Sequence, residues 1–78
     1  MRQVLDGKLY DTQKAKVVYT DNKSEDKRKL WQMNSTQSFF FTFADGHIEP
    51  ITRPEAEKYL GLVDVDVYIK MFGEPQEG

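Results

Sequence analysis

The hydrophobic pattern of the chain is centred on an aromatic run at residues 39–43, which is followed by the dipeptide Asp45-Gly46. Side chains alternate between the two faces of a strand, so the odd-numbered phenylalanines of the run share one face and Phe40 lies on the other. Asp-Gly supplies the positive φ angles of a two-residue hairpin loop. The pattern therefore predicts a central strand that turns here and returns with Ile48 opposite Phe43.

Two further strands complete a predicted three-stranded antiparallel meander around this run. From Lys27 the residues alternate with period two, which places Trp31 on the face of the odd-numbered phenylalanines and Leu30 on the face of Phe40. The returning strand contains Pro50, which has no N–H to donate to a ladder. We therefore expect this strand to be an edge of the sheet.

The N-terminal part of the chain predicts a small hairpin and then a short helix. Residues 4–10 form the hairpin, with Asp6-Gly7 as its two-residue turn. Asp11 or Thr12 can then cap a helix that extends to about Tyr19. The β-branched pair at positions 17 and 18 makes this helix less favourable than the others.

The C-terminal part predicts two helices. Thr52 is a good N-cap for a helix that ends at Leu60 with Gly61 as its C-cap. Residues 62–73 alternate like a strand but also carry apolar residues at helical spacing, with Asp64 in a position to cap. We favour the helix.

Together these segments predict a single α+β domain. The predicted order is an N-terminal β-hairpin, a short helix, a three-stranded antiparallel meander and two short C-terminal helices packed on the sheet. This domain spans residues 1–73, and we expect residues 74–78 to form a frayed tail.

Four segments of the chain resemble a group of small bacterial proteins from prophage and mobile-element regions of Gram-positive bacteria. They are the opening Val4–Ala15, the aromatic hairpin Phe39–Gly46, the helix start Pro50–Ala56 and the closing Tyr68–Gly73. The resemblance spans nearly the whole chain and implies an α+β fold. It implies no activity and provides no catalytic residues to carry over.

Composition excludes several classes of function. The chain has 78 residues, no cysteine and a formal net charge of -2, so it offers no disulfide framework, no thiol nucleophile and no global field that attracts nucleic acid. Its apolar runs are far shorter than the roughly 20 residues that a membrane span requires. We expect a cytoplasmic protein without a signal peptide or membrane association.

The inventory of polar residues argues against catalysis. His47 is the single histidine, and with Glu49 it could bind a metal weakly or act as a base. Its position after an Asp-Gly turn is ordinary for a solvated histidine. Asp64 and Asp66 are better explained as helix caps than as metal ligands. We expect no enzymatic activity, no metal site and no cofactor.

Two clusters are candidates for binding. Leu30 and Phe40 share a predicted face, which suggests a site for another protein or for self-association, unless the N-terminal hairpin or the first helix covers them. The run Lys27-Arg28-Lys29 could contact phosphates and is the basis of an alternative function, weak nucleic-acid binding. The sequence thus favours a non-enzymatic accessory or protein-binding module of a bacterial genetic element.

Overall fold

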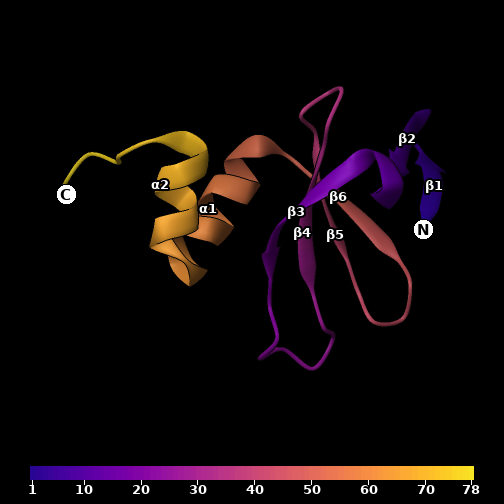
Figure 1. Ribbon diagram of the computed structural model, residues 1–78, viewed down its shortest axis with the longest axis horizontal. Coiled ribbons are helices and arrows are strands. Elements are labelled where there is room, and N and C mark those ends of the chain that lie inside the picture. Colours follow the sequence, from indigo (N-terminus) through magenta and orange to yellow (C-terminus); the bar gives the residue numbers. More distant parts are fainter.

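The computed structural model describes residues 1–78 and confirms the α+β class, with three layers (Figure 1). The elements are β1 (Arg2–Leu5), β2 (Lys8–Asp11), the 3-10 turn η1 (Thr12–Lys14), β3 (Ala15–Thr20), β4 (Lys29–Met33), β5 (Phe39–Thr42), β6 (Ile48–Ile51), α1 (Arg53–Val63) and α2 (Val65–Phe72). Strands β3 to β6 form one antiparallel sheet in chain order, and β1 pairs only with β2. Figure 1 shows the helices on one side of this sheet and the β1–β2 hairpin on the other.

The N-terminal hairpin forms as predicted. Val4 lies opposite Leu9, and Leu5 opposite Lys8, so the loop consists of two residues. Asp6 and Gly7 have φ angles of 52° and 74°, which is the pair of positive values that a type I′ turn needs.

The predicted helix up to Tyr19 is wrong beyond its first turn. Asp11 caps a single 3-10 turn by accepting a hydrogen bond from the Gln13 N–H at 2.9 Å, and the chain then continues as β3. The β-branched residues of this segment favour a strand, and pairing with β4 satisfies the backbone groups that a helix would otherwise pair internally. The meander is therefore one strand wider than predicted.

A bulge in β3 directs two consecutive side chains toward the helices. Val17 lies opposite Trp31 and Tyr19 opposite Leu30, so Val18 is an extra residue in this strand. Both Val18 and Tyr19 pack against the core on the helix side of the sheet.

The loop between β5 and β6 is longer than predicted, and the register of this hairpin differs by one residue. Thr42, not Phe43, lies opposite Ile48. The Gly46 N–H donates to the Phe43 carbonyl at 2.9 Å, and only Gly46 has a positive φ in this loop, at 90°. This is the three-residue loop with a left-handed glycine, the next most common hairpin connection.

Both C-terminal helices are present. Thr52 and Glu55 form a reciprocal capping box at the start of α1. The predicted end at Leu60 is wrong, because α1 continues through Gly61 to Val63, and Asp64 is both its C-cap and the N-cap of α2. α2 ends with Gly73 as its C-cap, which confirms the helical interpretation of this segment.

The sheet has a hydrophobic core on each face. The helix-side core contains Leu30, Phe39, Phe41, Phe43, Ala56 and Leu60. The hairpin-side core contains Tyr10, Met33, Phe40 and Ile48, with Trp31 packed against it. The predicted facing of β4 is therefore wrong, since Leu30 lies opposite Phe41 and Trp31 opposite Phe40.

Candidate functional site

The predicted protein-binding pair is not on the surface. Leu30 and Phe40 are both 0% exposed, and they lie in different cores. Tyr10 from the N-terminal hairpin covers Phe40, with ring centroids 5.6 Å apart. The expectation that these residues share an open face is wrong, because the hairpin covers one face and the helices cover the other.

The basic run does not form one cationic surface. The Arg28 guanidinium lies over the rings of Phe41, Phe43 and Tyr59, at 4.9, 5.2 and 5.8 Å from their centroids, on the helix side of the sheet. Lys29 lies opposite Thr42 and so belongs to the other face. The structure therefore places Arg28 and Lys29 on opposite faces of the sheet, although they are adjacent in the sequence.

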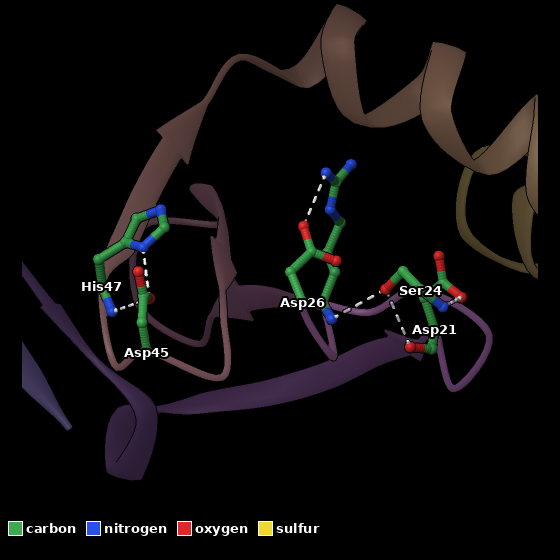
Figure 2. Close-up of polar contacts among 6 residues, drawn as sticks. Asp21, Ser24, Asp26, Asp45 and His47 are labelled. Atoms are coloured by element: carbon green, nitrogen blue, oxygen red, sulfur yellow. Dashed lines mark hydrogen bonds and ion pairs between the residues drawn. The ribbon is translucent and has the colours of Figure 1, made fainter.

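The loop that carries this run is folded by its own acidic and hydroxyl groups (Figure 2). Asp21 Oδ1 accepts from the N–H groups of Lys23 and Ser24, and Asp26 pairs with Arg28 at 3.5 Å. A side-chain hydrogen bond with Ser24 is the main reason that the pKa of Asp26 lies below its ordinary value, and the charge of Arg28 contributes to the same shift. The one ion pair of this loop thus joins two of its own residues, Asp26 and Arg28.

The single histidine is part of a local turn motif. Asp45 Oδ1 accepts from the His47 N–H at 3.0 Å and also contacts the ring Nδ1 (Figure 2). The first of these bonds is the main reason that the pKa of Asp45 is lowered. The imidazole also stacks on Phe43 with ring centroids 4.2 Å apart. Each of these contacts holds the tight β5–β6 loop in place, and Glu49 takes part in none of them.

A different group of cations gathers at the other end of the sheet, around the β4–β5 turn at residues 34–38. On one side of this turn is a groove of about 400 Å³, which we call the hairpin groove. Lys8 and Lys14 line it together with the hydroxyl-bearing residues Ser35, Thr36 and Ser38.

On the other side of the turn is a groove of about 310 Å³ between the sheet and the helices, which we call the helix groove. Lys16, Arg53 and Lys70 line it, and they come from β3, α1 and α2 respectively. The side-chain amides of Gln32 and Gln37 also line this groove.

The two grooves form one basic end of the molecule, defined by Lys8, Lys14, Lys16, Arg53 and Lys70. Neither groove is lined by a carboxylate, and among the five cations only Arg53 is in an ion pair, with Glu57 at 3.7 Å. The grooves adjoin each other, because residues 35, 36 and 38 line one and residue 37 lines the other. The β3–β4 and β5–β6 loops lie at the opposite end of the sheet (Figure 1).

The basic end is not recognisable in the sequence. Its five cations are spread along the chain, and the five elements that carry them must fold before they meet. The nearby lysines Lys14 and Lys16 are a partial sign of it in the sequence. The helix predicted for this segment did not place them beside any other cation.

A small apolar corner at the junction of α1 and α2 is the other exposed feature. Leu62, Val63 and Val65 are 79%, 39% and 55% exposed. No helix of the structure has the length and apolar character to span a bilayer, and no group of three or more His, Cys, Asp or Glu side chains is arranged to hold a metal ion.

Comparison of the chain with protein-family models, curated proteins and solved structures finds no match. The resemblance to proteins of prophage regions therefore stays an expectation from the sequence. Any proposal about function has to be based on the surface described above.

Proposed function

We propose that this protein is a non-enzymatic binding module whose basic end receives a protein partner that presents acidic side chains. One observation supports this most: five cations from five places in the chain line two adjoining grooves that contain no carboxylate. The formal net charge is -2, so this concentration of cations does not follow from a basic composition. Local complementarity of this kind directs association and selects partners.

The unpaired lysines strengthen the argument. No lysine of the chain is in an ion pair, and Lys8, Lys14, Lys16 and Lys70 also line grooves that contain no carboxylate. Like charges that line one groove repel each other at a cost that an external anion removes. A bound anionic partner would therefore supply the counter-charges that the chain itself does not.

Nucleic acid is the alternative anionic partner, and the aromatic residues of the basic end argue against it. Proteins that bind single strands stack bases on exposed rings. Here Tyr10 and Phe39 are buried, and the Arg53 guanidinium lies over Phe72 at 5.2 Å. The grooves instead offer ammonium, hydroxyl and amide groups beside short apolar walls, which suits acidic protein side chains.

Two variants with the same change in charge test the proposal. The basic-end variant carries Lys14→Gln, Lys16→Gln and Lys70→Gln, and the control variant carries Lys23→Gln, Lys29→Gln and Lys58→Gln. All six lysines are exposed, so neither variant should perturb the fold. The probes are poly-L-glutamate and a single-stranded oligonucleotide of similar charge, titrated at low salt.

We expect poly-L-glutamate to bind the parent protein and the control variant with similar affinity, and the basic-end variant roughly tenfold more weakly. Three lost ion pairs of about 0.2–1 kcal/mol each lead to this estimate. Added salt should weaken binding, because exposed charges are screened. Equal weakening in both variants would overturn the proposal, and tighter binding of the oligonucleotide would transfer it to nucleic acid.

A further inference from the structure

The helix groove has a more specific construction than the rest of the basic end. A row of side chains crosses the helix side of the sheet there, because Lys16 lies opposite Gln32 and Gln32 opposite Phe39. The start of α1 and the last turn of α2 contribute Arg53 and Lys70 beside this row. Three cations from three elements thus surround one concave space of about 310 Å³.

The floor of this groove is held rigidly. Gln32 is only 6% exposed, and its Nε2 donates to the Gln37 carbonyl at 3.3 Å and to Gln37 Oε1 at 3.0 Å. The Gln37 Nε2 in turn donates to the Asn34 carbonyl at 3.2 Å. This network fixes the Gln32 amide with both of its donor hydrogens directed toward Gln37.

The fixed amide leaves one acceptor without a donor. Gln32 Oε1 accepts no hydrogen bond within the protein, and Gln32 lines the helix groove. It is not one of the fully buried unpaired polar atoms of the protein, which are Arg28 Nε and the Tyr59 hydroxyl oxygen, so a donor in the groove can reach it. The groove therefore combines excess positive charge with one unused acceptor.

We propose that the helix groove is a binding site for a phosphate group, either free phosphate or a phosphomonoester. A phosphate carries about -1.5 to -2 charges near pH 7 and three strong acceptor oxygens, which match the cations Lys16, Arg53 and Lys70. Free phosphate carries a P–OH group in both of its forms near pH 7, and this group can donate to Gln32 Oε1. A phosphomonoester, with a second pKa of about 6, has this donor only in its singly charged minority form. An ionised carboxylate has neither the second charge nor the donor.

This inference rests on the proposed function, because the helix groove is part of the basic end, and it would make a phosphorylated side chain a preferred element of the acidic partner. Inorganic phosphate, O-phosphoserine and AMP all present a phosphate group, but they differ in the molecule to which this group is attached. Tighter binding of phosphoserine would assign a modified protein side chain, and tighter binding of AMP would assign a nucleotide. Either result supports a phosphate site.

The test is a titration of the ¹⁵N-labelled protein with inorganic phosphate at pH 7 and constant ionic strength, followed by amide chemical shifts. We expect saturable shifts around Lys16, Gln32 and Lys70, and a loss of affinity of roughly threefold in Lys16→Gln and in Lys70→Gln, the size expected for one exposed ion pair. Lys58→Gln is the matched control, because Lys58 is exposed and lies outside the helix groove. Its affinity for phosphate should equal that of the parent protein.

Acetate at the same ionic strength provides the second control. Equal shifts with acetate and phosphate, or an equal loss of affinity in Lys58→Gln, would overturn the phosphate site. If phosphate fails to bind while poly-L-glutamate still binds through the basic end, the phosphate site alone is refuted. If both fail, the proposed function is refuted as well.

Discussion

Leu30 and Phe40 lie on neighbouring strands of one sheet with their side chains on opposite faces, and both are 0% exposed. Leu30 packs with Phe39, Phe41 and the helix residues, whereas Phe40 packs between Trp31, at 6.1 Å, and Tyr10, at 5.6 Å between ring centroids. The sheet is therefore the middle layer of three. The two candidate grooves lie beside these covering layers, around the β4–β5 turn.

Phe40→Ala should test the layer formed by the N-terminal hairpin. Removing a fully buried phenylalanine costs about 3–5 kcal/mol of unfolding free energy, measured by urea denaturation. Phe40→Leu should lose about 1 kcal/mol and keeps the measurement possible if the alanine variant does not fold. Val4→Ala is the control, because Val4 is exposed and should change stability by less than about 0.5 kcal/mol. An alanine variant as stable as the parent would mean that the hairpin does not cover this face.

Local signals in the sequence predicted much of this fold. Both positive φ angles at Asp6-Gly7, the capping box at Thr52 and the end of α2 at Gly73 follow from a few adjacent residues. The facing of β4 could not be predicted in this way. It depends on which residue of β4 lies opposite Phe41, and pairing between strands is not encoded in the alternation of one strand.

The candidate site was beyond prediction for a related reason. The Lys27–Lys29 run is contiguous in sequence, yet Arg28 is directed toward the rings of the helix side and Lys29 toward the other face. Conversely, Lys16 and Lys70 are 54 residues apart in the chain and line the same groove. Clusters made by tertiary packing need the register and the helix positions before they can be recognised.

The capping box of α1 should give a measurable pH dependence of stability. Hydrogen bonds from the Thr52 N–H and hydroxyl hold the pKa of Glu55 below its ordinary value of 4.5. Because the folded-state pKa is depressed, the Glu55 carboxylate stabilises the fold fully at pH values above its unfolded-state pKa. This stabilisation is lost as the pH falls through the folded-state pKa.

Glu55→Gln should therefore be less stable than the parent at pH 7, and the difference should shrink below about pH 4.5. Thr52→Ala should cost about 0.5–2 kcal/mol at pH 7, because it removes the N-cap itself. Urea denaturation at pH 7, 5 and 3 measures both effects. A difference between Glu55→Gln and the parent that is the same at all three pH values would contradict the charge-assisted cap.

Tyr59 should control the alkaline limit of stability. Burial raises the pKa of Tyr59 to about 12, and its hydroxyl has no hydrogen-bond partner within the protein. Because the folded-state pKa is raised, the contribution of the neutral Tyr59 side chain to stability is complete below the ordinary pKa of 10. This contribution is lost as the pH rises toward 12. Ultraviolet titration should show one tyrosine of the four that ionises last.

Tyr59→Phe should remove that last ionisation and leave stability at pH 7 unchanged or slightly higher, because the variant no longer buries an unpaired hydroxyl. Its thermal unfolding should also depend less on pH between 10 and 12. A loss of more than about 1 kcal/mol at pH 7 would show that the hydroxyl has a stabilising partner, such as a buried water.

The most direct test of the basic end as the binding surface is a chemical-shift map of the ¹⁵N-labelled protein titrated with poly-L-glutamate. The account predicts that the perturbed amides cluster around Lys14, Lys16, the β4–β5 turn and the last turn of α2, and that the basic-end variant loses these shifts. Perturbations centred on the apolar corner at Leu62 or on the loop that carries Arg28, with the basic end unchanged, would contradict it.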